Sequence, residues 1–389
     1  MNKNSPSIET KNTENTNEEQ LRIQQRQNLI NNNNTPYKYN FKKTTTIKNI
    51  IDSFSNLKAG EKETSSFKIA GRLMAKRVHG KALFGNIQDH SETLQFYINI
   101  NDIKESLFND INNFNIGDII GIEGSPFCTK RGELSLRITH GELLTKSLHP
   151  LPEKFHGLQD KEKRYRQRYL DLIVNKEVKQ TFETRSKTIT LIRNWLTNKQ
   201  FMEVETPVLQ SIYGGAEARP FTTHHNELKQ DLFLRISLEL PLKRLIVGGF
   251  EKIFEIGRVF RNEGVSYKHN PEYTLLELYQ AYADYNDMMT LTESLLSTLV
   301  QEITGNTTIQ YKNQTLSFTP PFKRITLTDA LKQYANINSN NTDEMIQKAN
   351  EANLELPNNV SKIQLIAALY DHFVEPQLIQ PTFITDHPW

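Results

Sequence analysis

The sequence predicts an α+β protein in which a small β-barrel precedes a larger domain of strands and helices. From about residue 67 to about residue 140, short runs of alternating apolar and polar residues are separated by glycines and polar turns. After about residue 175, apolar residues recur at helical spacing and then give way to further alternating strands. Strands flanked by helices in this order are typical of antiparallel sheets. The length of 389 residues is sufficient for two or three domains.

Composition narrows the class of protein. The formal net charge is only +2, which does not oppose nucleic-acid binding because a local basic surface is sufficient. No run of about 18 apolar residues is present, so the sequence predicts no membrane-spanning helix. The single cysteine, Cys128, excludes an intrachain disulfide framework and a multi-cysteine zinc site. Together these features favour a cytoplasmic enzyme over a secreted or membrane protein.

The first 40 residues are polar and end in four consecutive asparagines, residues 31–34. Burial of so few apolar groups cannot offset the chain entropy lost on folding. Residues 1–40 are therefore predicted to be a disordered tail with a transient helix around Glu18–Leu29. Acidic residues such as Glu9 and Glu14 argue against an organellar transit peptide.

Residues 41–145 are predicted to hold the β-barrel. Five alternating runs, FKIAGRLMAKRV, ALFGNIQD, LQFYINI, DIIGIEGSPF and ELSLRIT, read as five strands. Their number, spacing and glycine content are typical of an OB-fold, which often binds single-stranded nucleic acid. A linker over residues 146–174 follows, and its basic residues are Lys154, Lys161, Lys163, Arg164, Arg166 and Arg168. Such a run is either a solvated helix face or a surface that contacts phosphates.

Residues 175–389 are predicted to form the second domain. A helix to about residue 199 precedes FMEVETPVLQ, a strand whose Pro207 suits an edge or irregular position. The strand DLFLRISLEL then runs into the helix PLKRLIVGGF, and a long amphipathic helix covers DYNDMMTLTESLLSTLVQEIT. Residues 323–376 are predicted to add further helices.

Residues 257–279 carry the most informative pattern, a strand, a polar loop and a second strand. Alternation places Tyr273, Glu277 and Tyr279 on one face of the second strand. A carboxylate within such an apolar strand costs several kcal/mol unless a cation meets it. The cation is either Arg261 or part of a ligand. The loop adds polar groups that could hold a nucleotide, although a merely solvated hairpin loop is the alternative.

The segment FRNEG resembles motif 2 of the class II aminoacyl-tRNA synthetases. HNPEYT, ELYQAYADY and GGAEARPFTTHHN are most similar to the lysyl branch, in subclass IIb. The resemblance implies ATP-dependent activation of lysine to lysyl-adenylate, transfer to tRNA(Lys) and a requirement for Mg²⁺. It implies no protein nucleophile, so catalysis would come from positioning and charge neutralisation. The helix and strand around Pro207 resemble motif 1, which implies a homodimer.

The resemblance also assigns residues. Arg261 and Glu263 are the implied catalytic residues, with Arg261 bridging the lysine carboxylate and the ATP α-phosphate. The implied ATP-binding residues are Arg261, Glu263, His269, Asn270 and Tyr273. The implied lysine-binding residues are Gly215, Glu239, Arg261, Glu277 and Tyr279. Those implied to contact the tRNA anticodon are Arg77, Phe84 and Gln95. Four of these keep a structural alternative: Phe84 as barrel core, His269 as a loop-stabilising residue, Glu239 as a surface salt bridge and Gly215 as a turn glycine.

The sequence ends at DHPW, where the resembling family continues into motif 3 and its acidic metal ligands. We therefore read the chain as truncated before motif 3, assign no metal ligand and expect weak or absent activity. One alternative is a noncatalytic tRNA-binding fragment or paralogue, against which Arg261, Glu263 and Glu277 argue. A second is a synthetase for aspartate or asparagine, which GGAEARPFTTHHN disfavours. A third is a lysyl transferase that acts on a protein, which the barrel disfavours.

Overall fold

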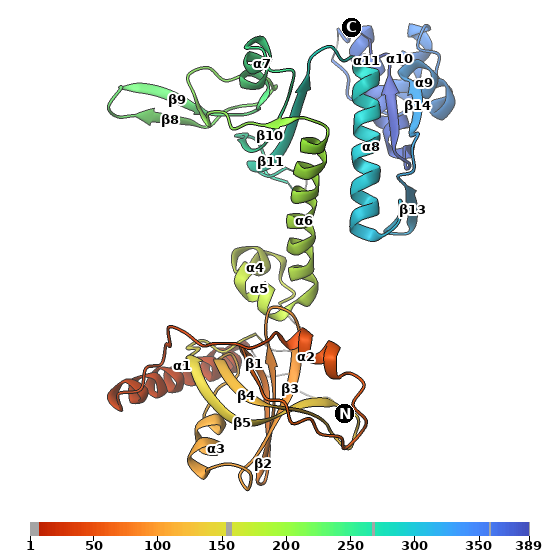
Figure 1. Cartoon of the computed structure of the whole chain (residues 1–389). Coiled ribbons are helices and arrows are strands. Elements are labelled where there is room, and N and C mark those ends of the chain that lie inside the picture. The colour runs from red at the N-terminus through yellow and green to blue at the C-terminus, as the bar shows by residue number, and fades with distance from the viewer. Residues whose placement is uncertain (1–7, 153–157, 267–268, 358, 389) are drawn as a thin grey trace. The chain divides into compact units, whose positions relative to one another are not determined.

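The computed structural model describes residues 8–152, 158–266, 269–357 and 359–388, with side chains described from residue 17 onward. The chain forms two compact units, residues 1–176 and 177–389 (Figure 1). Along the described ranges, no helix combines the length and apolar character that crossing a membrane requires.

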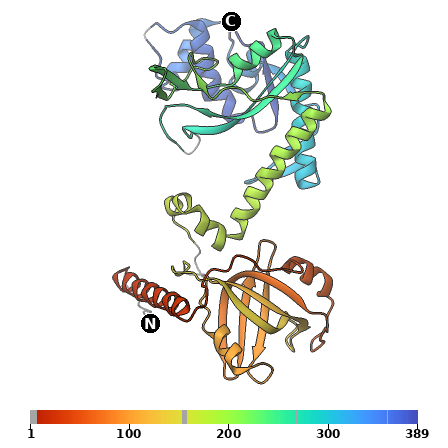
Figure 2. The same cartoon turned by 60° about the vertical axis from the view of Figure 1, so that its left-hand side comes forward.

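The first unit contains the predicted OB-fold as a closed five-stranded barrel (Figure 2). Its strands, in the spatial order β1-β2-β3-β5-β4, are β1 (Phe67–His79), β2 (Ala82–Gln88), β3 (Thr93–Asn99), β5 (Leu134–Thr145) and β4 (Ile119–Cys128). β3 and β5 pair in parallel and the other neighbours are antiparallel. In β2 and β3, buried and half-buried residues alternate along the whole strand. Inward residues such as Ile87 and Phe96 therefore form the core, while their neighbours face outward.

Two short helices complete the barrel core. α2 (Ile47–Phe54) contributes Ile47 and Ile50, and α3 (Glu105–Asn112) contributes Phe108 and Ile111. The side chain of Thr46 caps α2 by accepting a hydrogen bond from the Asn49 N–H, as an N-cap threonine does in many helices. Local capping and apolar spacing therefore place both helices against the barrel.

The N-terminal segment differs from the predicted disordered tail, because residues Ile8–Asn31 form helix α1. Arg22 is only 2% exposed. Its guanidinium binds the Glu18 carboxylate at 2.6 Å and donates to the backbone oxygen of Ile116 at 3.0 Å. α1 is thus attached to the barrel unit through polar contacts. The prediction of disorder used only the shortage of apolar residues. It differs from the structure because composition does not indicate these polar contacts.

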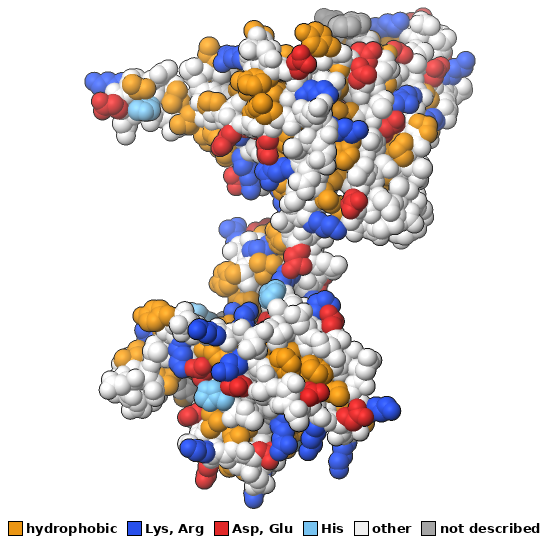
Figure 3. Space-filling view, in the orientation of Figure 1, with side chains coloured by type: hydrophobic (Ala, Val, Ile, Leu, Met, Phe, Trp, Pro, Cys, Tyr) orange, Lys and Arg blue, Asp and Glu red, His pale blue; other side chains and the backbone are white. Residues whose placement is uncertain are grey.

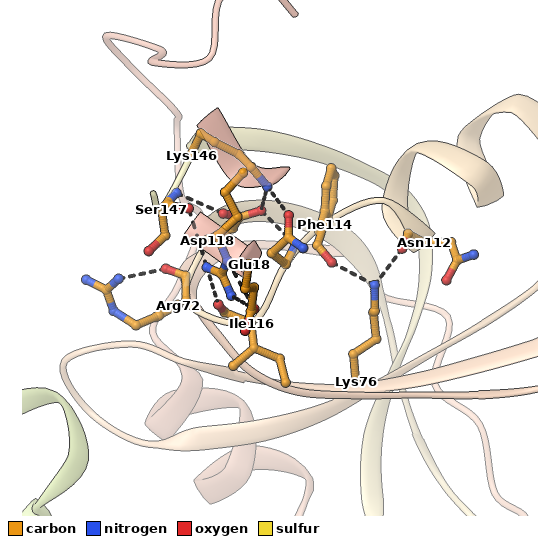
Figure 4. A network of polar contacts seen from close by, with 12 residues as sticks. Glu18, Arg72, Lys76, Asn112, Phe114, Ile116, Asp118, Lys146 and Ser147 are labelled. Carbon is orange, nitrogen blue, oxygen red and sulfur yellow. Dashed lines mark hydrogen bonds and ion pairs between the residues drawn. The ribbon is translucent and has the colours of Figure 1, made fainter. Parts of the chain in front are cut away.

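The chain between α3 and β4 is held by several cationic side chains (Figure 4). Lys146 and Asp118 form a buried ion pair of 2.9 Å, and burial lowers the pKa of Lys146 although Asp118 opposes this shift. Arg72 donates to the Gly117 oxygen at 2.7 Å, and Lys76 donates to the Phe114 oxygen at 2.7 Å. Carbonyl groups that burial would leave without water are therefore satisfied by side chains.

The basic linker forms α4 (Lys161–Arg166) and α5 (Arg168–Val174). Arg164 and Arg168 both bind the buried carboxylate of Asp171, Arg164 at 2.9 Å. Two residues of the basic linker, Arg164 and Arg168, are therefore engaged in internal ion pairs. Its exposed basic residues are Lys161, Lys163 and Arg166, and Lys154 lies outside the described residues.

The second unit is organised around antiparallel strands β10 (Lys252–Phe260) and β11 (Glu272–Gln280), with β6 (Met202–Glu203) parallel to β10. Helix α7 (Glu239–Val247) packs on one face of these strands, where Leu242 meets Ile253 and Val259. The opposite face carries Phe254 and Leu276, which cluster with residues of α6 (Lys176–Asn198) and α8 (Tyr285–Thr304). The alternation predicted for the second strand, β11, is thus confirmed.

The remaining elements surround this centre. β7 (Leu209–Gln210), β9 (Gln230–Leu234) and β8 (Thr222–His225) form a small sheet in that order. Pro207 lies between β6 and β7, so the predicted strand FMEVETPVLQ is two short strands with an irregular centre. A hairpin and a parallel strand pair follow, respectively β12 (Thr308–Tyr311) with β13 (Gln314–Ser317) and β14 (Lys323–Thr326) with β15 (Thr382–Thr385).

The predicted helical insertion has a hydrophobic core of its own, which includes Leu331, Met345 and Leu369. Its helical elements are α9 (Leu327–Ala335), α10 (Thr342–Glu351), α11 (Lys362–Leu369), η1 (Tyr370–Val374) and η2 (Glu375–Gln377).

Candidate active site and nucleic-acid interface

The loop that joins β10 to β11 encloses a cavity of about 230 Å³. The residues that line it are Arg261, Glu263, Gly264, His269, Asn270, Pro271 and Tyr273. All five residues predicted to bind ATP are in this set. Nucleotide-sized ligands need several polar groups that converge on one cavity, and the structure brings such groups together here.

Arg261 is held at the mouth of the loop by its backbone and its side chain. Its N–H donates to the Pro271 oxygen at 2.8 Å, and its guanidinium carbon lies 5.5 Å from the centre of the Tyr273 ring. Its Nε donates to the Ile236 oxygen at 3.3 Å. Among the described residues, the two terminal nitrogens have no hydrogen-bond partner. They are therefore available for the bidentate anion recognition that suits a guanidinium.

His269 and Asn270 shape the loop as well as line the cavity. The His269 Nδ1 lies 2.8 Å from the Ser266 hydroxyl, and the amide of Asn270 donates to the Glu272 oxygen at 2.9 Å. Both side chains and that of Glu263 are exposed. The contact with Ser266 therefore supports a loop-stabilising role for His269, but His269 also lines the cavity.

Glu277 projects from β11 toward the start of α7. Its Oε1 accepts hydrogen bonds from the Ser237 hydroxyl at 2.9 Å and from the Leu238 N–H at 3.0 Å. The Tyr279 hydroxyl donates to Oε2 at 3.3 Å. Burial, followed by the negative charges of Glu277 and Glu239, raises the pKa of Tyr279. Across the part of the chain that the structure describes, no basic side chain lies within 4 Å of the Glu277 carboxylate.

Glu239, the first residue of α7, lies beside the same group of residues. Its N–H donates to the Ser237 hydroxyl at 3.0 Å, and its carboxylate binds Lys243 at 2.7 Å. Gly215 has a φ of +83°, and a Cβ at this position would lie 2.8 Å from the Glu239 Cβ. Glycine is therefore required both for this backbone conformation and for the close approach. The structure thus brings Gly215, Glu239, Glu277 and Tyr279 together around Ser237, and Arg261 contacts the preceding residue, Ile236. The predicted surface salt bridge of Glu239 is also present.

Sequence reasoning missed a buried ion pair beneath the site. Arg235 of the β9–α7 connection binds Glu255 of β10 at 2.6 Å, and both side chains are almost fully buried. The Thr206 hydroxyl donates to the other carboxylate oxygen at 2.6 Å, and Arg235 also donates to the Arg258 oxygen at 2.7 Å. A Cβ at Gly257 would collide with the Arg235 guanidinium. The sequence signal that could have indicated this ion pair is Arg235, an arginine inside the otherwise apolar run DLFLRISLEL.

In the first unit, all three residues predicted to contact the anticodon, Arg77, Phe84 and Gln95, line a cavity of about 680 Å³. Arg77 and Phe84 are register partners on β1 and β2. The Phe84 ring is half-buried and lies 5.0 Å from the Tyr97 ring, whereas its neighbour Leu83 is in the core. The Gln95 amide donates to the Ser135 hydroxyl at 2.8 Å. The same cavity is lined by the basic residues Lys76, His79, Lys130 and Arg131.

Comparison with known proteins agrees with this arrangement. The family described as tRNA synthetases class II (D, K and N) matches residues 160–389, and an OB-fold nucleic acid binding domain matches residues 67–144. The fold and the site thus define a class II tRNA synthetase with an anticodon-binding barrel.

Individual relatives refine this assignment. A lysine–tRNA ligase of Clostridium novyi is 48% identical over 94% of this chain and 72% of the relative. One from Clostridium botulinum is 47% identical over 94% of this chain and 73% of its own length. A third, from a Thermoanaerobacter species, is 49% identical over 90% and 69%, respectively. The chain belongs to the lysine–tRNA ligase family of the class II tRNA synthetases.

Proposed function

We propose that this protein activates lysine with ATP and transfers the lysyl group to tRNA(Lys). One observation carries the proposal: Arg261, which lines the cavity of the β10–β11 loop, donates to the Ile236 oxygen, while the Glu277 carboxylate and the Glu239 N–H both bind the Ser237 hydroxyl. A nucleotide site and an acidic amino-acid site therefore adjoin each other.

Lysine brings two ammonium groups, and each needs a negative partner when it leaves water. Glu239 and the backbone of Gly215 would bind the α-ammonium, with Glu239 exchanging its exposed contact to Lys243. Glu277 and Tyr279 would bind the ε-ammonium. Aspartate and asparagine lack this second cation, so they would leave the Glu277 charge unmatched.

Arg261 would bridge the lysine carboxylate and the ATP α-phosphate. One carboxylate oxygen attacks the α-phosphorus, the bond to the bridging oxygen breaks, and pyrophosphate leaves. The guanidinium holds the two reacting anions together and neutralises charge as it develops. Tyr273 is the proposed stacking surface for adenine, while Glu263, His269 and Asn270 would hold the nucleotide from the loop.

Magnesium would supply further neutralisation of the phosphates. Among the described residues, no group of three or more His, Cys, Asp or Glu side chains could hold a metal ion. No metal ligand is therefore assigned, and none of the steps above depends on a metal ion.

The first unit would supply tRNA recognition. Phe84 would stack on an anticodon base, Gln95 would bind a base edge and Arg77 would contact phosphate or base. Stacking on aromatic rings is a common basis of single-strand binding by OB-folds, and the half-buried Phe84 ring has the accessibility that stacking requires.

We further propose a homodimer that acts in the cytoplasm. Residues 202–213 expose an unusual number of large apolar side chains, namely Met202, Val208, Leu209, Ile212 and Tyr213. Hydrophobic side chains also gather on the surface of the second unit around α7 and β9 (Figure 3). A contiguous exposed apolar surface commonly marks a protein interface. Sedimentation equilibrium would test the dimer, and a monomer at micromolar concentration would contradict it.

The activation reaction can be tested by amino-acid-dependent ATP–pyrophosphate exchange. Any exchange that the chain supports, even if weak, should depend on lysine and not on aspartate or asparagine. Exchange with either competitor instead would assign the site to another branch of the class. A lack of all exchange, with tRNA(Lys) binding intact, would favour the alternative of a noncatalytic tRNA-binding protein.

A further inference from the structure

We propose that Ser237 is a positioning residue that orients Glu277 toward the lysine ε-ammonium and so contributes to the choice of a diamino acid. This inference rests on the proposed lysine site. Ser237 would not touch the substrate's side chain itself. It would act through the Glu277 carboxylate.

The Ser237 hydroxyl lies where the parts of the site meet. The residue is only 3% exposed, so its hydroxyl has little access to water. The hydroxyl donates its single proton to Glu277 Oε1 at 2.9 Å and accepts the Glu239 N–H at 3.0 Å. A Cβ at Gly215 would lie 2.9 Å from the same oxygen. One side chain therefore contacts the carboxylate of Glu277 and the backbone of Glu239.

The hydrogen bonds divide the Glu277 carboxylate into two unlike oxygens. Oε1 is taken by the Ser237 hydroxyl and by the Leu238 N–H, and both donors belong to the same short segment. Oε2 has a longer contact, 3.3 Å, to the Tyr279 hydroxyl. Two donors on one oxygen fix the carboxylate's rotation, so Oε2 is the oxygen that an arriving ammonium would meet. Loss of the Ser237 donor would leave only the Leu238 N–H to hold Oε1.

Removal of the hydroxyl isolates this role. Ser237→Ala deletes the donor to Glu277 and leaves the charge of the carboxylate in place. Ser339→Ala is the matched control, because Ser339 is also buried and its hydroxyl lies 3.3 Å from that of Thr328, within the helical insertion.

The ligands are two non-hydrolysable adenylate analogues, 5′-O-[N-(L-lysyl)sulfamoyl]adenosine and its norleucyl counterpart. They differ only in the ε-ammonium. Isothermal titration calorimetry on the full chain measures both affinities. We expect Ser237→Ala to weaken the lysyl analogue about tenfold, which corresponds to about 1.4 kcal/mol. The norleucyl analogue should change less than twofold, as should both ligands in Ser339→Ala.

A double-mutant cycle shows whether Ser237 acts through Glu277. In a Glu277→Gln background, Ser237→Ala should change affinity for the lysyl analogue less than twofold, because coupled residues are not additive. A full tenfold effect in that background would overturn the inference. So would equal weakening of both analogues, or no weakening, in the single variant. If the unsubstituted chain bound neither analogue, the proposed function itself would fail, and the inference with it.

Discussion

Glu255 and Glu277 lie directly opposite each other on antiparallel β10 and β11, but only Glu255 has a cationic partner among the described residues. Like charges at opposed positions destabilise a strand pair. Arg235 neutralises Glu255 from within the fold, whereas Glu277 accepts hydrogen bonds from two hydroxyls and one backbone N–H. The Glu277 charge thus has no cationic partner among the described residues, and we propose that a ligand cation matches it.

The first prediction concerns the buried pair. Arg235→Leu should lower the free energy of unfolding by about 3–5 kcal/mol, because it leaves the Glu255 carboxylate buried and unpaired. Urea denaturation measures the change. Arg193→Ala is the control, since the Arg193–Glu203 pair of 2.8 Å is largely exposed and should contribute at most about 1 kcal/mol. Equal losses in the two variants would show that the buried pair has no special role.

Arg261→Ala should lower the rate constant of lysine-dependent ATP–pyrophosphate exchange by about 10²–10³-fold, as loss of a preorganised charge contact typically does. Arg261→Lys should restore little, because an ammonium cannot reproduce the bidentate geometry. Arg244→Ala removes an exposed arginine from α7 and should leave the rate unchanged. Near-normal exchange in Arg261→Ala would remove Arg261 from the proposed mechanism.

Phe84→Ala should weaken tRNA(Lys) binding by about 1–3 kcal/mol, the usual contribution of one stacked base. Its slope of log affinity against log salt should stay unchanged, because no phosphate contact is lost. Tyr39→Ala removes a fully exposed aromatic residue from the same unit and serves as the control. Filter-binding titrations at several salt concentrations provide the test. Unaltered affinity would place the anticodon elsewhere.

Asp89 links the stability of the barrel unit to pH. Its carboxylate accepts the Ile47 N–H at the start of α2 at 3.0 Å and the Ser91 hydroxyl at 2.6 Å. Burial alone would raise the pKa of Asp89, but the hydrogen bonds from Ser91, Ile47 and Glu92 outweigh it and lower the pKa. A lowered pKa in the folded state stabilises the fold above the unfolded-state pKa of about 3.9, and this contribution is lost as pH falls through the folded-state pKa.

Asp89→Asn should therefore reduce stability by on the order of 1 kcal/mol at pH 7. The gap to the unsubstituted protein should close as the pH falls below about 4. Denaturant titrations between pH 7 and pH 3 measure this gap. A gap that is constant or grows toward acid pH would contradict the assignment.

Features with a regular period were predictable from sequence. Alternation alone indicated the barrel strands and placed Tyr273, Glu277 and Tyr279 on one face, where the structure has them. The short motifs then located the loop residues that line the β10–β11 cavity. These inferences succeed because neighbouring residues in a strand or tight loop have few possible arrangements.

Contacts between distant elements were not predictable in the same way. Arg235 and Glu255 belong to different elements, and nothing in the local pattern names them as partners. The anchoring of α1 through Arg22 depends on backbone oxygens far along the chain. The Ser237 hydroxyl is equally inconspicuous, because its role comes from the separate strand that carries Glu277.

The central claim is that the Glu277 carboxylate binds the ε-ammonium of lysine, and Glu277→Gln tests it most directly. Calorimetric titration with the lysyl and norleucyl sulfamoyladenosines should show the lysyl analogue weakened by about 3 kcal/mol or more, in the range for truncating one member of a buried charge pair. The norleucyl analogue should bind as well as before or better. Glu272→Gln, at an exposed position of β11, should change neither affinity. Equal losses for the two analogues, or none for the lysyl compound, would contradict the claim.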